Sequence, residues 1–201
     1  LRAPQWNKSS IAPDREFSAI IIGAGMSGIA AAHRLRQAGV PVTILEKNDD
    51  VGGTWLENKY PGCRVDIQNH MYSYSFAQRH DWPYFFSPQQ VLHQYFRDCA
   101  EQFDLLPIIK FNTEVVSMRW REAEQHWQVT LRGHDGDEMQ RQYKAVITAV
   151  GQLNRPKMAP FPGMDSFTGT WWHSALWRHD VSLKGKRVAV IGTGASAMQF
   201  L

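Results

Sequence analysis

The sequence predicts an α/β fold with a parallel sheet, a small antiparallel meander, and the start of a second α/β unit near the C-terminal end. Two observations predict it. A short apolar run precedes a glycine-rich turn at residues 23–28, and the same pattern recurs at residues 192–197. Each is typical of a buried strand, a tight turn and the start of a helix. Between them, three strand patterns of alternating polarity follow one another, which indicates the meander.

The first pattern forms a complete strand–helix–strand unit. It predicts a strand at 17–22, a helix at 26–38 that stops at Gly39, and a strand at 41–45. In the Rossmann arrangement, glycines at this turn let the backbone bend sharply and approach a pyrophosphate, which the helix N-terminus then holds. One such turn is weak evidence, because glycine turns also serve packing. Two of them in strand context indicate two dinucleotides in one polypeptide, as hydride transfer from nicotinamide to flavin requires.

Two features close to this turn extend the predicted site. Glu46 ends the second strand, 23 residues after Gly23, close to the spacing at which an acidic side chain accepts hydrogen bonds from the adenosine ribose. The alternative is a solvated glutamate at a strand end. Residues 52–55, Gly-Gly-Thr-Trp, form a second flexible backbone patch that can reach the flavin side of the pyrophosphate, and the alternative there is an ordinary loop.

The remaining elements follow from caps and alternation. A helix at 88–103 is predicted with Ser87 as N-cap, Pro88 at its first position and Gln90 completing a capping box. Its apolar stripe includes Cys99, which we therefore expect in the core. The three meander strands are expected at residues 114–120, 127–132 and 138–143, followed by a strand of the main sheet at 145–149. Pro156, Pro160 and Pro162 mark a stiff connecting segment.

Composition excludes several classes of function. The chain has 43% apolar residues with eight Trp and ten Phe, enough for a substantial core, and a formal net charge of only +3. The basic residues are scattered, so we expect no nucleic-acid partner. The longest apolar stretch is broken by glycines and is too short to span a bilayer. Cys63 and Cys99 match no metal-binding or redox spacing, which predicts no metal site and a reduced, cytoplasmic setting.

One loop carries charged residues in a constrained backbone. Residues 60–66 read Tyr-Pro-Gly-Cys-Arg-Val-Asp, so that the guanidinium of Arg64 and the carboxylate of Asp66 lie two residues apart. Taken alone, this pair also fits an ordinary surface pair. Residues 72–76, Tyr-Ser-Tyr-Ser-Phe, follow closely.

Together these motifs resemble the class B flavin monooxygenases, and in particular the type I Baeyer–Villiger monooxygenases. The decisive stretch is a linker fingerprint with the spacing F-x-G-x-x-x-H-x-x-x-W, formed by Phe167, Gly169, His173 and Trp177. Arg178 departs from the family pattern, which has Pro or Asp there and a basic residue in the N-hydroxylating relatives. Trp177 still favours the Baeyer–Villiger side, and the neighbouring segments are most similar to the 4-hydroxyacetophenone monooxygenase branch.

The resemblance implies an enzyme that uses FAD, NADPH and O2 to insert one oxygen next to a ketone carbonyl, giving an ester or lactone. It implies that Asp66 orients a catalytic arginine supplied by a later part of the family's chain, that Arg64 contacts NADP, and that a hydrogen bond from His173 helps to hold two domains together. Cofactor-binding positions carried over are Gly23, Gly25, Met26, Ser27, Gly28, Glu46, Gly53, Thr54, Trp55, Asp66, Tyr72, Val115, Gly192, Thr193, Gly194, Ala195, Ser196 and Gln199.

The same resemblance divides the chain. We expect an extension at 1–15, the first part of an FAD-binding domain at 16–153, the fingerprint linker at 154–184, and the start of an NADP-binding domain at 185–201 that is truncated here. The chain is thus expected to be an inactive fragment of a longer enzyme. An N- or S-hydroxylating flavin monooxygenase is the nearest alternative. A flavin-dependent disulfide reductase also carries two dinucleotide turns, but it needs a redox-active cysteine pair, and Cys63 and Cys99 are not spaced for one. The non-enzymatic alternative is a fragment that only binds FAD.

Overall fold

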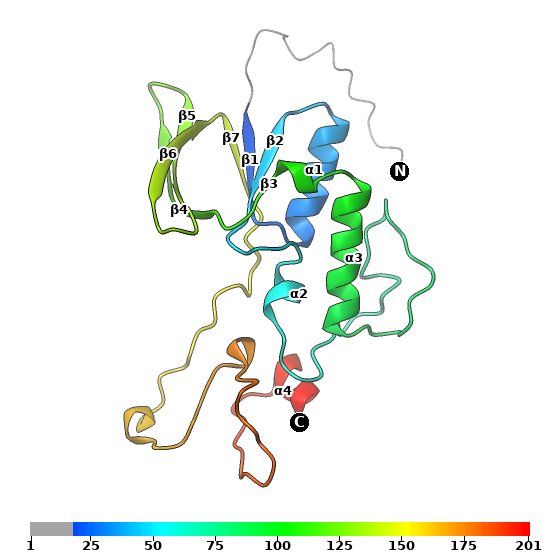
Figure 1. The fold of residues 1–201 in the computed structure, drawn as a ribbon, viewed down its shortest axis with the longest axis vertical. Helices are drawn as coiled ribbons and strands as arrows, with labels where there is room; N and C mark the ends of the chain where they lie inside the picture. Colours follow the sequence, from blue (N-terminus) through cyan, green and yellow to red (C-terminus); the bar gives the residue numbers. More distant parts are fainter. Residues whose placement is uncertain (1–17) are drawn as a thin grey trace. The chain divides into compact units, whose positions relative to one another are not determined.

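A computed structural model describes residues 18–201, so the expected extension at 1–15 and Phe17 of the first predicted strand lie outside the described residues. The described chain forms two compact units, followed through the sequence in Figure 1. The first comprises residues 18–53 and 95–151, and the second comprises residues 54–94 and 152–201. This grouping follows spatial contacts, and the domain boundaries drawn from the sequence stay a prediction.

The first unit contains a parallel sheet with the strand order β3-β2-β1-β7 (Figure 1). Its strands are β1 (Ala19–Ile22), β2 (Val42–Leu45), β3 (Ile109–Lys110) and β7 (Ala145–Thr148). The central strand β1 is a continuous apolar run, as expected of a parallel strand covered on both faces. Ile22 pairs with Leu45 on one side and with Thr148 on the other, so the carboxyl ends of these three strands share one edge.

Helix α1 (Met26–Gln37) connects β1 to β2, as predicted. Its buried face consists of Gly28, Ile29 and Ala32, which repeat at helical spacing. The helix ends at Gly39, whose φ of 74° is the left-handed conformation that glycine adopts easily. The strand–helix–strand unit predicted from the sequence is therefore confirmed.

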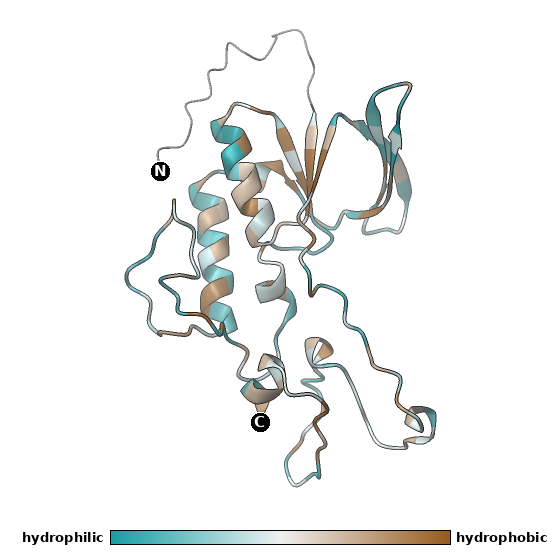
Figure 2. Cartoon of the chain, turned by 180° about the vertical axis from the view of Figure 1, so that it is seen from behind, coloured by the Kyte–Doolittle hydropathy of each residue, from teal (hydrophilic) through white to brown (hydrophobic). Residues whose placement is uncertain are grey.

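The antiparallel meander is formed by β4 (Glu114–Arg121), β5 (His126–Arg132) and β6 (Glu138–Tyr143), within a residue of the predicted bounds. Val129 and Leu131 of β5 pack with Ile20 and Leu45 in one buried cluster, so the meander shares a core with the parallel sheet. Figure 2 shows the contrast between the apolar strands of the parallel sheet and the more polar meander. The predicted mixed α/β fold is confirmed.

Helix α3 (Gln89–Gln102) buries the predicted stripe, and Cys99 is in the core with 2% of its surface exposed. The predicted N-cap is wrong. In a capping box the side chain of Gln90 would accept the backbone N–H of Ser87. In the structure Asn69 Oδ1 accepts this N–H at 2.6 Å. The Pro88 carbonyl accepts the first helical N–H groups, and Ser87 Oγ is buried without a hydrogen-bond partner among the described residues.

The second unit has little regular structure. Its helices are α2 (Thr54–Glu57) and α4 (Ala195–Phe200), with 3-10 turns η3 (Met164–Ser166) and η4 (Ser174–Leu176); a further turn, η2 (Leu106–Ile108), lies in the first unit. The strand expected at 188–191 is not formed, and Val188 and Ile191 are exposed. A strand needs a neighbour to satisfy its backbone groups, and no described segment pairs with this one.

Candidate dinucleotide-binding site

The first glycine turn brings the start of α1 to the carboxyl end of β1. Gly23 has a φ of 101° and its N–H donates to the carbonyl of Leu45 at 2.8 Å, which anchors the turn to β2. Gly25 is the N-cap of α1 and has no side chain to cap it. A helix leaves its first backbone N–H groups without intrahelical acceptors, and the helix dipole favours negative charge there. This geometry is suited to a phosphate group.

The three glycines of the turn have different structural roles. A Cβ at Gly28 would lie 1.9 Å from the Gly23 carbonyl oxygen, and a Cβ at Gly23 would lie 2.7 Å from the Ala149 oxygen. Both positions are closed by backbone: Gly28 lets α1 pack against the end of β1, and Gly23 lets the backbone after β7 approach the turn. A Cβ at Gly25 would meet no atom closer than 3.5 Å. Gly25 therefore makes ordinary contact with Gly53, and packing alone does not require a glycine there.

The second patch packs against the first. The Gly52 N–H donates to the Ala24 carbonyl at 3.0 Å, and a Cβ at Gly53 would lie 3.0 Å from Gly25 Cα. Gly52 and Gly53 have φ values of 120° and 53°, both in the range that favours glycine. Within the first unit, the partly exposed backbone of Gly25 and Gly53 thus lies beside the turn that Gly23 and the buried Gly28 close. This arrangement fits the pyrophosphate of a dinucleotide.

Glu46 is buried beside this surface, with 4% of its residue area exposed. Its Oε2 accepts the Ala24 N–H at 2.6 Å and its Oε1 accepts the Asn48 N–H at 2.9 Å. Two backbone donors therefore compensate the carboxylate and connect the end of β2 to the turn. Each carboxylate oxygen can accept a second hydrogen bond, so Glu46 can hold the turn and still receive a ribose hydroxyl. The sequence suggested only the ribose role.

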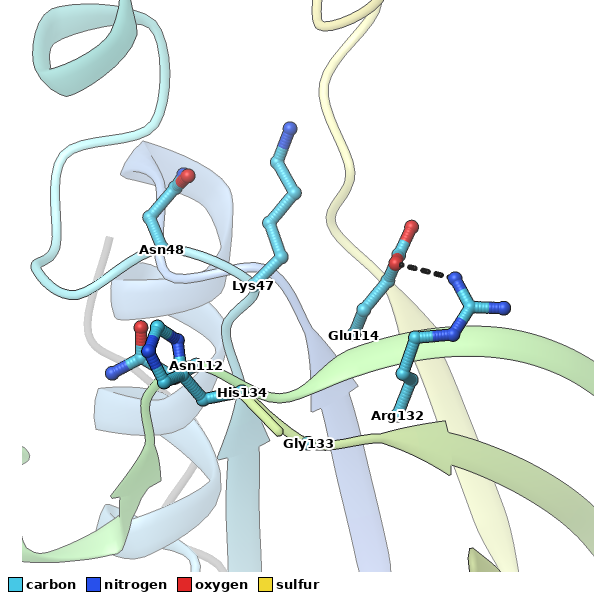
Figure 3. Close-up of a pocket in the computed structure, with 7 residues that line it drawn as sticks. All are labelled: Lys47, Asn48, Asn112, Glu114, Arg132, Gly133 and His134. Atoms are coloured by element: carbon cyan, nitrogen blue, oxygen red, sulfur yellow. Dashed lines mark hydrogen bonds and ion pairs between the residues drawn. The ribbon is translucent and has the colours of Figure 1, made fainter. Parts of the chain in front are cut away.

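A cavity of about 270 Å³ opens where the carboxyl end of β2 meets the meander (Figure 3). It is lined by Lys47, Asn48, Asn112, Glu114, Arg132, Gly133 and His134. Arg132 Nη1 donates to Glu114 Oε2 at 3.2 Å across paired strands. The sequence identified Glu46 on one side and Val115 on the other, and it missed Arg132 and His134. Pairing of β4 with β5 in the folded chain places Arg132 beside Glu114, and no pattern in the sequence indicated His134.

In the second unit, Trp55 and Tyr72 form a pair. Trp55 Nε1 donates to Tyr72 Oη at 3.1 Å, and their rings meet edge-on with centroids 5.7 Å apart. Burial raises the pKa of Tyr72. Thr54 begins α2, and its carbonyl accepts the Asn58 N–H at 3.0 Å. The structure thus joins two residues that the resemblance named separately.

The second glycine turn has the same local form. Gly192 has a φ of 122°, and Gly194 is the N-cap of α4. Two of the predicted cofactor residues are bonded to the loop at residues 60–64. Ser196 is hydrogen-bonded to Tyr60, and Gln199 is hydrogen-bonded to Tyr60 and to the backbone of Arg64. Burial raises the pKa of Tyr60 to about 12, while the Ser196 hydrogen bond lowers it. The side chains of Arg64 and Asp66 are exposed.

The fingerprint residues lie in irregular backbone. Phe167 is 60% exposed, and its ring lies so close to Gly169 that a Cβ there would be 2.5 Å from Phe167 Cζ. His173 Nδ1 accepts the Ala175 N–H at 3.1 Å and so caps η4. Trp177 packs on Phe200 of α4 with ring centroids 5.0 Å apart. In the described structure, the side chain of His173 therefore stabilises the start of η4.

Residues 18–201 contain no cluster of three or more His, Cys, Asp or Glu side chains that could hold a metal ion. Within that range no helix is both long and apolar enough to cross a membrane. Cys63 and Cys99 are both buried free thiols.

Comparison with known proteins agrees with the geometry. A model of the flavin-binding monooxygenase-like family matches residues 17–200. A Baeyer–Villiger monooxygenase of Streptomyces coelicolor is 43% identical over 183 residues, which are 90% of this chain and 34% of the relative. One of Pseudomonas aeruginosa is 42% identical over 188 residues, 93% of this chain and 35% of the relative.

Solved structures give the same result. The crystal structure of OTEMO in complex with FAD and NADP superposes with a TM-score of 0.79 at 36% identity, covering 92% of this chain and 36% of that one. The chain thus spans about a third of the length of the proteins it matches.

Proposed function

Because the chain belongs to the flavin-binding monooxygenase-like family, we propose that the full-length protein is an FAD- and NADPH-dependent Baeyer–Villiger monooxygenase. It would insert one oxygen of O2 next to the carbonyl of a small-molecule ketone and so give an ester or lactone. The observation that carries the proposal is the glycine turn of Gly23, Gly25 and Gly28, with Gly53 packed against it and the buried Glu46 beside it. The relatives named Baeyer–Villiger monooxygenases support the reaction class.

Residues of the first unit would hold the adenosine and pyrophosphate part of FAD. The first turn of α1, which follows the N-cap Gly25, would supply backbone N–H groups for the phosphates. Glu46 would accept from the ribose with its remaining lone pairs. The cavity at the meander, next to the Val115 backbone, would receive the adenine end. FAD held there would supply the redox chemistry of the reaction with NADPH and O2.

Asp66 and Arg64 would act on the reaction side. Both side chains are exposed in the second unit, on a loop that Gly62 bends with a φ of 77°. We assign Asp66 the positioning of an arginine guanidinium and Arg64 a contact to NADP. Ketone oxygenation develops negative charge on oxygen, and a cation fixed in place stabilises such charge. Five residues of the second glycine turn remain our candidates for the NADP pyrophosphate: Gly192, Thr193, Gly194, Ala195 and Ser196.

Partners and setting complete the proposal. The substrates are a ketone and O2, and neither nucleic acid nor a membrane takes part. We place the protein in the cytoplasm, since Cys63 and Cys99 are unpaired thiols in the core and a disulfide framework is absent from the described residues.

The test is oxygenation by the full-length protein. Incubated with NADPH, O2 and a panel of aryl and cyclic ketones, it should give a product heavier than the ketone by one oxygen. Amines and thioethers run in parallel would reveal an N- or S-oxygenating enzyme instead. NADPH oxidation without an oxygenated product from any ketone would refute the assignment.

Asp66→Ala separates the reaction side from FAD binding. We expect the variant to retain FAD and to lose about 10²–10³-fold in oxygenation rate, because one fixed electrostatic contact is removed. NADPH oxidation should continue with release of H2O2. Flavin absorbance and product formed per NADPH measure the two effects. A well-coupled Asp66→Ala enzyme would show that Asp66 has only a structural role.

A further inference from the structure

The loop that carries Arg64 pairs with its neighbours on two edges. On one edge, the Val65 N–H donates to the Ser87 carbonyl at 3.1 Å and the Gln89 N–H donates to the Cys63 carbonyl at 2.8 Å. These bonds form an antiparallel bridge between Arg64 and Pro88. In extended backbone, successive residues direct their N–H and C=O groups to opposite sides. The N–H and C=O of Arg64 therefore point away from the bridge.

The side chain of Gln199 occupies that other edge. Its Nε2 donates to the Arg64 carbonyl at 2.9 Å, and its Oε1 accepts the Arg64 N–H at 3.3 Å. A carboxamide has the donor and acceptor of a peptide group, so Gln199 pairs with Arg64 as a neighbouring strand would. The Tyr60 hydroxyl donates to the same Oε1 at 2.9 Å, which holds the amide in this orientation.

The backbone of α4 is equally close to the loop. A Cβ at Gly62 would lie 2.1 Å from the Gln199 carbonyl oxygen, so only glycine permits this approach. Phe200, the next residue of the helix, contacts the ring of Tyr60 with centroids 6.0 Å apart. Both the backbone and the side chains of α4 thus contact residues 60–64.

We propose that Gln199 is a positioning residue: its amide holds the Arg64 backbone from α4, and the placement of Arg64 and Asp66 depends on this contact. The resemblance assigned Gln199 to the cofactor, and the structure assigns its amide to the protein. The kinetic consequence rests on the proposed function, whereas the hold on the loop does not.

The direct test is trypsin cleavage after Arg64 in the full-length protein. Arg64 has an exposed side chain, so cleavage there is limited by how often its backbone leaves the bonded conformation. Gln199→Leu removes the donor and the acceptor, and we expect cleavage after Arg64 to accelerate about tenfold. Met198→Leu changes a side chain that is 70% exposed on the same helix, and it should cleave like the wild type.

Cleavage after Arg97, within α3, reports global unfolding. Equal acceleration after Arg64 and Arg97 would show that Gln199 acts only on overall stability and would overturn the proposal, as would an unchanged rate after Arg64. If Gln199→Leu does not fold, Tyr60→Phe removes one hydrogen bond from the amide and should accelerate cleavage after Arg64 by a smaller factor. No acceleration in Tyr60→Phe would then overturn the proposal.

A kinetic measurement tests the consequence for Arg64. In Gln199→Leu, the KM for NADPH should rise while FAD occupancy stays at the wild-type value, because the loop moves and the FAD surface does not. Loss of FAD together with NADPH affinity would contradict a local role. If the wild type oxidises no ketone, the cleavage result still decides whether Gln199 holds the loop.

Discussion

The two glycine-rich turns of this chain have nearly the same backbone and very different surroundings. Gly23 and Gly192 have φ values of 101° and 122°, and the N-caps Gly25 and Gly194 have φ values of −77° and −74°. In the first turn the preceding strand pairs on both sides, whereas the segment before the second turn pairs with no described strand. The turn is therefore a local property, while the strand depends on its neighbours.

Packing around the glycines shows the same difference. At Gly23 and Gly28 a Cβ would collide with backbone oxygens at 2.7 and 1.9 Å. At Gly192 and Gly194 a Cβ would meet no described atom within 4 Å. In the first turn, glycine is required because the backbone packs too closely for a Cβ. At Gly192, glycine is required only by its positive φ.

The largest expected effect comes from Gly28→Ala. The new methyl group collides with the Gly23 carbonyl, which belongs to rigid backbone, so α1 must move off β1. We expect the free energy of unfolding of this chain to fall by about 3 kcal/mol or more. Gly194→Ala should change it by no more than about 0.5 kcal/mol, since its φ suits alanine and nothing lies nearby. Urea unfolding of both variants compares the turns, and equal losses would contradict the contrast.

Glu46→Ala should have the next largest effect. It leaves the buried Ala24 N–H without its acceptor, and this costs about 2 kcal/mol of stability without cofactor. A further loss of about 1–3 kcal/mol in FAD affinity is expected from the missing ribose hydrogen bonds. Glu101→Ala, an exposed carboxylate on α3, is the matched control and should change neither quantity. If Glu46→Ala lowered FAD affinity alone, its hold on the turn would be unimportant.

Sequence reasoning predicted the elements whose signals are local. The strands and helices predicted for the first unit appear within one or two residues of their predicted ends, because apolar periodicity and glycine stops act over a few residues. The two-residue strand β3 was not predicted, because it is too short to show a period. The N-cap of α3 was wrong because Asn69, far away in the sequence, takes the N–H that the capping box needed. The strand at 188–191 was wrong because periodicity says nothing of a pairing partner.

The candidate site divides in the same way. The glycines and Glu46 were found because their spacing is a known signal. Three other contacts were not predictable from the sequence. They are the hydrogen bond from the Ala24 N–H to Glu46, the lining of the cavity by Arg132 and His134, and the hydrogen bonds of Gln199 to Arg64. Each joins residues that only the folded chain brings together, so no local pattern reports them.

The smallest expected effects concern two exposed ion pairs, one in each unit. Arg36 of α1 contacts Asp104 beyond the end of α3, with Nη2 and Oδ2 3.1 Å apart, and also donates to the Phe103 carbonyl at 3.3 Å. Arg178 contacts Asp180 only two residues away, with Nε and Oδ1 2.9 Å apart. Arg36→Ala should cost about 1 kcal/mol, because it removes a contact that exists only in the fold. Arg178→Ala should leave the free energy of unfolding unchanged.

The pH dependence sharpens this last contrast. The hydrogen bond from Arg178 lowers the pKa of Asp180 to about 2. A lowered pKa in the folded state alone would add stability above the unfolded pKa and lose it as the pH falls. Here the partners are so near in sequence that the unfolded chain forms the same pair, so both pKa values fall together and no dependence results. Asp180→Asn should therefore leave the urea midpoints at pH 7 and at about pH 2 unchanged. A midpoint loss that is present at pH 7 and disappears as the pH falls to about 2 would show that folding, rather than sequence proximity, creates the Arg178–Asp180 pair.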